Sequence, residues 1–252
     1  MHRTRMSVLR SFKALPAAIG LAVMVASCAS PAAEAPADRG VLADQPGSAA
    51  PGSTAPASPG ASTTPPGWKT FTTADESLSF DYPSSWSIRD EAGKAALEGQ
   101  FVDVLNSEGK QMAALRTNVV TGQVCTAKSP YLAFDSVPMQ ALAEPGAADS
   151  LPPRFVFEGR GDVTALDPLP PTVAAYGITT VPEPTGDVAC PIFQLFLWPP
   201  SGALFGQAYN SAVNATPGGA GLPYLEKAKL YTETPEYQDI RTMITSLRPA
   251  MK

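Results

Sequence analysis

The chain has 252 residues, of which 16% are charged, with 18 basic and 23 acidic residues and a formal charge of −5. An acidic surplus without any block of Lys or Arg repels phosphate backbones, so we expect no nucleic-acid partner. The one histidine is His2, so a chain that loses its N-terminus has no imidazole for a Ser-His-Asp or Cys-His hydrolase, or for a histidine-bound metal or haem.

The N-terminal segment has the pattern of a secretory signal peptide. Residues 1–13 carry four basic residues and no acidic one, and the apolar stretch Leu15–Val25 is too short to span a bilayer as a mature helix. The adjacent arginine pair of a Tat signal is missing, which favours Sec export. The alternative is a signal anchor that is never cleaved. Removal of residues 1–27 leaves 14 basic against 23 acidic residues, a formal charge of −9.

The run Val25-Ala26-Ser27-Cys28 resembles the lipobox of bacterial lipoproteins. The resemblance implies lipidation of Cys28 after cleavage of a lipoprotein signal peptide at residues 1–27. The lipid on Cys28 would hold the protein at the membrane, extracytoplasmic and lipid-anchored to the cell membrane. Two acyl chains at ~0.8 kcal/mol per methylene make such an anchor effectively permanent. Which membrane carries it stays open.

A disordered linker is predicted at residues 28–67, directly after the proposed anchor. The stretch Ala29–Gly67 holds eight prolines among Ala, Ser, Gly and Thr, with no aromatic residue. It cannot bury enough apolar surface to offset the entropy of ordering. Aromatic and β-branched residues return at Trp68, which predicts a single α+β globular domain over residues 68–252.

Two further cysteines, Cys125 and Cys190, lie in the predicted domain. Outside the cytoplasm an even pair most simply forms one disulfide, and in the chain-entropy model a long closed loop contributes at most about 4 kcal/mol. The alternative is a redox-active pair. That chemistry usually needs a close spacing such as Cys-x-x-Cys, which is absent.

Alternating and continuous apolar runs predict a mostly antiparallel sheet. Residues 106–110 join two of the strands as a hairpin with Gly109 at a positive φ, and residues 199–202 join two others. The run Ile192–Trp198 predicts a buried strand because it has little polar face. The predicted strands are residues 78–82, 86–88, 100–105, 112–120, 155–157, 172–181, 192–198 and 203–209.

Two helices are predicted, and we expect them to pack on the faces of the sheet. Residues 131–142 place apolar side chains at helical spacing, although Pro138 makes this helix short or broken. In the C-terminal helix Thr234 is the cap and Pro235 fits the first turn. Apolar residues recur there up to Leu247, and Arg248 and Pro249 end the helix.

The stretch Leu78-Ser79-Phe80-Asp81-Tyr82-Pro83-Ser84-Ser85-Trp86-Ser87-Ile88 resembles the opening hairpin of Mog1/PsbP-like domains. There a Phe-x-Tyr-Pro strand leads through a turn to a Trp under the sheet. The closing helix with Ile244 and Ser246-Leu247 is similar to that family's last helix. The resemblance implies an antiparallel sheet with helices on its faces, and many such domains are secreted lipoproteins of actinobacteria. Family members are binding or assembly modules more often than enzymes.

Three short motifs have simpler explanations than function. Ser107-Glu108-Gly109-Lys110 matches Ser-x-x-Lys but lacks the partner motifs of penicillin-binding enzymes, so a hairpin turn explains it. Arg160-Gly161-Asp162 is an adhesion tripeptide that a turn at a strand end also explains. Gly218-Gly219-Ala220-Gly221 is predicted to be a loop, because no strand-to-helix transition of a phosphate-binding loop follows.

We therefore expect a membrane-anchored lipoprotein whose domain binds an unidentified envelope protein or acts in assembly, without catalysis and without a metal or cofactor. The alternative is a carrier of an apolar ligand such as lipid. A third possibility is an enzyme that uses carboxylates, which needs two acidic residues converging in a deep pocket. The candidate aromatic lining of a carrier cavity is Phe193, Phe196, Trp198, Phe205 and Tyr209, although core packing explains such residues equally well.

Overall fold

The computed structural model describes residues 64–91, 98–122, 124–143 and 151–250. The predicted signal peptide, Cys28 and the predicted linker up to residue 63 lie outside the described residues and stay predictions. The last residues of the predicted linker contact the fold. The Thr64 hydroxyl donates to Asp81 Oδ1 (3.2 Å), and the Gly67 carbonyl accepts from the Ser84 amide (2.9 Å).

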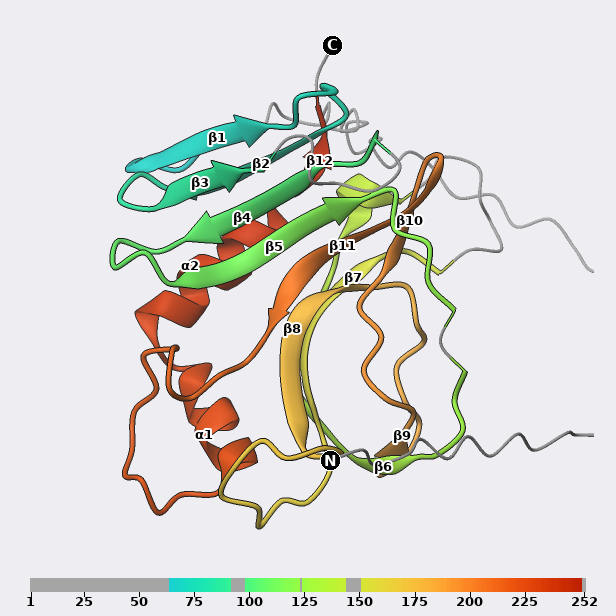
Figure 1. The fold of residues 1–252 in the computed structure, drawn as a ribbon, viewed down its shortest axis with the longest axis vertical. Helices are drawn as coiled ribbons and strands as arrows, with labels where there is room; N and C mark the ends of the chain where they lie inside the picture. Colours follow the sequence, from blue (N-terminus) through green and yellow to red (C-terminus); the bar gives the residue numbers. More distant parts are fainter. Residues whose placement is uncertain (1–63, 92–97, 123, 144–150, 251–252) are drawn as a thin grey trace, which may run out of the picture. The chain divides into compact units, whose positions relative to one another are not determined.

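The described residues form an α+β structure in which antiparallel sheets dominate, as predicted (Figure 1). A three-stranded sheet has the order β1-β2-β12, with bounds Trp68–Thr72, Leu78–Pro83 and Arg248–Pro249. The larger sheet has the order β3-β4-β5-β11-β8-β7-β6-β9, and β10 also pairs with β11. Its strands are β3 (Ser87–Asp90), β4 (Phe101–Leu105), β5 (Gln111–Thr117), β6 (Ser129–Pro138), β7 (Arg154–Arg160), β8 (Val173–Thr179), β9 (Val188–Ala189), β10 (Phe196–Trp198) and β11 (Ser201–Ala208).

The helices are α1 (Tyr224–Tyr231), α2 (Pro235–Thr245) and the short 3-10 helix η2 (Gln140–Leu142). The prediction for α2 is confirmed, since the Thr234 hydroxyl accepts a hydrogen bond from the Tyr237 amide and Pro235 lies in the first turn. Helix α1 was not predicted. Its N-cap is Pro223, which has no side-chain acceptor, so the usual sequence signal of a helix start is missing.

Both predicted hairpins are confirmed. Strands β4 and β5 flank a turn in which Gly109 has φ +77° and the Asn106 side chain accepts from the amides of Glu108 and Lys110 (both 3.0 Å). Strands β10 and β11 pair across residues 199–200. The Ser-x-x-Lys stretch is thus a hairpin turn, as expected, and its lysine is paired with Glu108 at the surface.

The predicted helix over residues 131–142 is wrong, because this stretch is strand β6 followed by η2. Strand β6 pairs antiparallel with β7, and a bulge lies between Ala133 and Asp135. The extra residue, Phe134, shifts the two-residue alternation by one position, so that apolar residues before and after it imitate helical spacing. Pairing with β7 then decides the conformation.

The predicted buried strand Ile192–Trp198 is only partly confirmed. Strand pairing covers residues 196–198 alone, and Leu197 is 59% exposed. Strands β8 and β11 pair directly with each other, so residues 190–195 have no strand partner in this part of the sheet. Their apolar side chains instead belong to an irregular segment, and continuous hydrophobicity does not distinguish these two cases.

The core lies on one face of the larger sheet, beneath the helices and the smaller sheet. The rings of Phe80 in β2 and Phe205 in β11 are 4.8 Å apart. Phe157 in β7 contacts five other rings, with centroid distances from 5.0 to 6.4 Å. These rings belong to Phe134, Tyr176, Tyr209, Tyr231 and Tyr237. Aromatic packing therefore joins strands and both helices in one cluster.

The tyrosines of this core have their hydroxyl groups satisfied. Burial raises the pKa of Tyr224 and of Tyr209, each to about 12, so the phenols stay neutral donors at physiological pH. A buried phenol needs a partner, and each of the four fully buried ones donates a hydrogen bond of 2.8 Å. The acceptors are Met112 O for Tyr176, Tyr209 O for Tyr224, Glu236 Oε1 for Tyr231 and Asp135 Oδ2 for Tyr237.

Candidate ligand-binding pocket

The two faces of strand β7 differ in chemistry because side chains alternate along a strand. Phe155 and Phe157 face the core, whereas Arg154, Glu158 and Arg160 face the other side. Charged residues on the outer face of a sheet are normally solvated. Here Glu158 and Arg160 are only 5% and 4% exposed, so another part of the chain covers this face.

The covering segment is the stretch between β8 and β10, residues 180–195, which we call the strap. Figure 1 shows the strap on one side of β7 and β8, with α1 and α2 on the other. Its two ends meet. The Thr179 hydroxyl donates to Phe193 O (2.8 Å), and the Thr180 amide donates to Leu195 O (3.2 Å). The strap is thus a long loop with a closed base, similar in geometry to an Ω-loop.

Four further contacts hold the strap in place over the sheet. Strand β9 within it pairs with the start of β6, and the Tyr131 amide donates to Asp187 O (2.8 Å). Arg160 Nε donates to Cys190 O (2.7 Å), and the Arg154 guanidinium donates to Val181 O (3.2 Å). The strap is therefore fixed along its length although only two of its residues are in a strand.

The predicted disulfide between Cys125 and Cys190 is present and attaches the strap to the segment before β6. The two cysteines are 65 residues apart in the sequence, so the bond closes β6, β7 and β8 into one loop. Cys28, the predicted lipidation site, lies outside the described residues.

One strap residue packs directly on the sheet through two glycines. A Cβ at Gly177 of β8 would lie 2.8 Å from Gln194 Oε1, and one at Gly206 of β11 would lie 3.1 Å from the same atom. Only glycine permits this approach. Gly177 of β8 and Gly206 of β11 therefore let one end of the strap reach the sheet.

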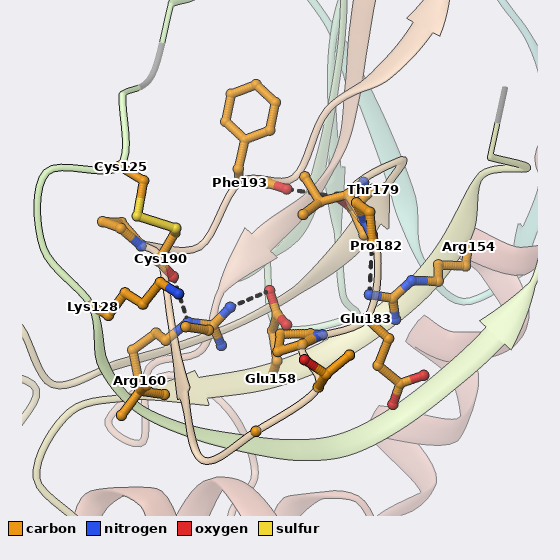
Figure 2. A pocket seen from close by; sticks show the side chains of 17 residues that line it. Cys125, Lys128, Arg154, Glu158, Arg160, Thr179, Pro182, Glu183, Cys190 and Phe193 are labelled. Atoms are coloured by element: carbon orange, nitrogen blue, oxygen red, sulfur yellow. Dashed lines mark hydrogen bonds and ion pairs between the residues drawn. A yellow bond between two sulfur atoms is a disulfide. The ribbon is translucent and has the colours of Figure 1, made fainter. Parts of the chain in front are cut away.

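Between the strap and the sheet lies a pocket of about 730 Å³ (Figure 2). The volume falls within the range of ligand pockets in proteins. Its apolar lining comes mostly from the strap, with Val181, Pro182, Val188 and Phe193 among the residues involved. Val181 and Val188 are 42% and 48% exposed, so the pocket presents aliphatic surface to solvent.

The charged groups of the pocket stand on opposite walls. Lys128 and Arg160 lie on the disulfide side, and Arg154 and Glu183 lie on the opposite side (Figure 2). Arg160 forms an ion pair with Glu158 (3.3 Å) and stacks its guanidinium over the Tyr131 ring (4.6 Å to the centroid). Both charges of that pair are nearly excluded from solvent, and together they form a closed floor.

The pKa of Tyr131 reflects the burial and the charges beside this floor. Burial raises the pKa of Tyr131, and the nearby carboxylates of Glu158 and Glu183 raise it further, whereas Arg154 and Arg160 oppose the change. The phenol therefore stays protonated at physiological pH. It contributes a neutral polar group and a flat ring to the region of Arg160.

The aromatic residues predicted to line an apolar cavity are not brought together. Phe196, Phe205 and Tyr209 are buried in the core. Phe193 lines the pocket under the strap, and Trp198 lines a smaller hollow with Leu142 and Pro249. Burial in the closed core removes three of the five from any ligand site.

The pocket residues Arg154, Glu158 and Arg160 were missed by the sequence analysis. The signal is the alternation in Arg154-Phe-Val-Phe-Glu-Gly-Arg160, which places every charge on one face of the strand. The alternation alone indicates a solvated face, because nothing in it shows that a remote segment covers the strand. Arg160-Gly161-Asp162 lies at the end of β7, as expected, with Gly161 at φ +104°. Its buried arginine is not presented to a receptor.

Gly218–Gly221 lies in a loop, as predicted, and helix α1, which was not predicted, begins at Tyr224. The Lys227 amine of that helix donates to Ala220 O (3.3 Å). Among residues 64–91, 98–122, 124–143 and 151–250, no group of three or more His, Cys, Asp or Glu side chains is placed to hold a metal ion.

Comparison with protein-family models, with curated proteins and with solved structures finds no match for this chain. Within the described part of the chain, no helix has the length and apolar character needed to cross a membrane.

Proposed function

We propose that this chain is a lipid-anchored, extracytoplasmic binding protein that acts without catalysis, and that its ligand enters the pocket beneath the strap. The observation that supports it most is the strap itself. Sixteen residues, 180–195, are fixed by a disulfide, a β-bridge and two arginines, and they enclose a hollow instead of filling it. A loop held so firmly around a pocket is typical of a binding site on a rigid scaffold.

In this proposal the membrane anchor is inferred from the Cys28 motif. The Mog1/PsbP-like fold is inferred from residues 78–88 and the last helix. Strand β2, strand β3 and helix α2 occupy the expected stretches of the chain. The two strands do not pair as a hairpin, because β2 pairs with β1 and β12 and β3 pairs with β4. A binding role also agrees with the pairing of Glu158 to Arg160. A carboxylate engaged in that pair is not free to act as the acid or base of a hydrolase.

The proposal is tested on the native lipidated protein in its own membrane. Cys28→Ser is expected to abolish palmitate incorporation and membrane partition. Val188→Trp, which adds a large side chain to the pocket lining, is expected to leave both unchanged and to abolish whatever co-purifies with the wild-type protein. A co-purifying species that survives Val188→Trp, in a variant with unchanged melting temperature, would contradict the assignment of the pocket.

The second candidate is a carrier of an apolar ligand, which the aliphatic and proline lining of the strap favours. Solvent extraction of the purified protein followed by mass spectrometry is expected to recover a lipid in a stoichiometric amount. Val188→Trp serves as the matched control, because it should release the lipid without unfolding the protein. A clean extract from the wild-type protein would remove this candidate.

A further inference from the structure

The pocket carries an excess of positive charge on a chain that is acidic as a whole. Its lining includes Lys128, Arg154 and Arg160 against Glu158 and Glu183, whereas the chain has a formal charge of −5. A positive local field attracts anionic ligands even when the protein as a whole is negatively charged. The pocket is therefore electrostatically distinct from the rest of the protein.

Only part of this charge is neutralised within the fold. Arg160 is paired with Glu158. Arg154 donates to two neutral acceptors, Ser136 Oγ (3.1 Å) and Val181 O (3.2 Å), and makes no ion pair with any described residue. Lys128 likewise has no ion pair within the described part of the chain.

Arg154 is held in place before any ligand arrives. Its two hydrogen bonds connect β6, β7 and the strap, so the guanidinium has a defined position on the pocket wall. An arginine presents five N–H donors in a planar fork, and two acceptors leave donors unused. A pre-positioned guanidinium recognises carboxylate or phosphate oxygens with little loss of side-chain entropy.

The rest of the lining excludes a small hydrated anion as the best ligand. The strap contributes aliphatic side chains, prolines and the Phe193 ring, which cannot replace the hydration of free phosphate or sulfate. A ligand that matches both the arginine and the apolar lining has an anionic head, which contacts the arginine, and an apolar body, which contacts the strap. The volume of about 730 Å³ accommodates such a molecule.

We propose that the pocket binds an anionic amphiphile, with its carboxylate or phosphate head at Arg154 and its apolar chain along Val181, Val188 and Phe193. This assignment rests on the proposed function, since it names the ligand class of the same pocket. The shared chemistry is a single anionic head on an apolar chain. A free fatty acid and a membrane phospholipid both provide it.

The test uses the full lipidated protein in phosphatidylcholine vesicles with photoreactive dodecyl probes that differ only in the head group. The heads are carboxylate, phosphate, hydroxyl and trimethylammonium, and cross-linked peptides are mapped by mass spectrometry. We expect the carboxylate and phosphate probes to label the strap, with half-saturation at about tenfold lower concentration than the other two. A separate arm supplies phosphatidylglycerol with a photoreactive acyl chain in the vesicle, which distinguishes the membrane source from the free acid.

The variants separate the head-group contact from folding. Arg154→Gln is expected to raise the half-saturating concentration of the anionic probes about tenfold. Lys128→Gln should raise it no more than about threefold, because Lys128 is exposed and on the opposite wall, so it acts only through the local field. Arg154→Lys should recover part of the affinity. Lys69→Gln removes the same charge from an exposed position on β1, outside the pocket, and should change nothing.

Two failures are distinguishable. Equal labelling of the strap by all four probes would overturn the anionic assignment while leaving the pocket as a ligand site. Labelling that avoids the strap, or that is unchanged in Val188→Trp, would overturn both this inference and the proposed function. Melting temperatures of all variants show whether any loss comes from unfolding.

Discussion

Strand β7 separates two regions that are built in different ways. On its core face Phe157 contacts five aromatic rings, and the hydroxyl groups of the fully buried tyrosines find acceptors. On its strap face the side chains are charged, the covering segment is irregular, and a hollow remains. The close-packed core and the candidate pocket under a disulfide-bonded loop therefore lie on opposite sides of one strand.

The difference lies in what keeps each region in place. The core is held in place mainly by burial of apolar area. The strap exposes Val181 and Val188, so burial stabilises it little. Its position depends on the disulfide, the short β9 pairing and two arginines. Perturbing the two faces separately should therefore give separable effects.

The largest effect on stability is expected from Phe157→Ala. The substitution leaves a cavity among five aromatic rings, and we expect a loss of about 3–5 kcal/mol in the free energy of unfolding. Urea denaturation followed by tyrosine fluorescence measures it. The control is Phe193→Ala in the strap, which is partly exposed and should cost much less. Equal losses for the two variants would contradict the contrast between the faces.

The disulfide should give the next largest effect. Cys125→Ser with Cys190→Ser opens a loop of 65 residues that includes core strands, so the free energy of unfolding is expected to fall by about 2–4 kcal/mol. Hydrogen exchange is expected to rise more in the strap than in β7 and β8. A loss near zero with unchanged exchange in the strap would show that the remaining contacts are sufficient to hold it.

Much of the core side was predictable from sequence, because its signals are local. The turn around Gly109 and the cap at Thr234 each depend on a few neighbouring residues, and both are confirmed. The Cys125–Cys190 bond was also predictable, since these are the two cysteines of the predicted domain. Buried strands such as Phe155–Phe157 were recognised by composition.

The strap side was less predictable because its structure depends on distant segments. The bulge at Phe134 imitated helical spacing, and the apolar run at residues 192–195 lacked a strand partner that the sequence does not reveal. The role of Arg154 depends on Val181 and Ser136, which reach it from the strap and from β6. Long-range covering of a charged strand face has no pattern in a single sequence.

The ion pair of Asp81 with Arg248, outside the pocket, should stabilise the fold more than the unpaired Arg154 of the pocket does. Asp81 accepts from both terminal nitrogens of Arg248 (3.0 and 3.2 Å) and from Thr70 (2.6 Å). Burial alone would raise the pKa of Asp81, but these hydrogen bonds and the Arg248 charge outweigh it and lower the pKa below its ordinary 3.8.

Asp81→Asn is therefore expected to cost about 1–3 kcal/mol at neutral pH, whereas Arg154→Gln should stay within about 0.5 kcal/mol. Because the pKa of Asp81 is depressed in the folded state, its contribution is present above pH 3.8 and is lost as the pH falls through the lower folded value. Denaturation curves between pH 7 and pH 2 measure both effects. Curves for the wild type and for Asp81→Asn that stay equally far apart at low pH would contradict this cause.

The smallest effect on stability is expected from Val188→Ser, which best separates the stability of the fold from ligand affinity. Val188 lines the pocket and is 48% exposed, so the free energy of unfolding should change by less than about 0.5 kcal/mol. Its methyl groups nevertheless form part of the apolar surface offered to a ligand, and their removal should weaken binding of the dodecyl carboxylate probe about fivefold, at ~0.8 kcal/mol per buried methylene-sized group. Val120→Ser, at a 76% exposed site outside the pocket, is the matched control for both measurements. Both positions contribute almost equally little to the stability of the fold. A lower affinity of Val188→Ser with an unchanged affinity of Val120→Ser therefore requires a pocket that binds its ligand through the strap.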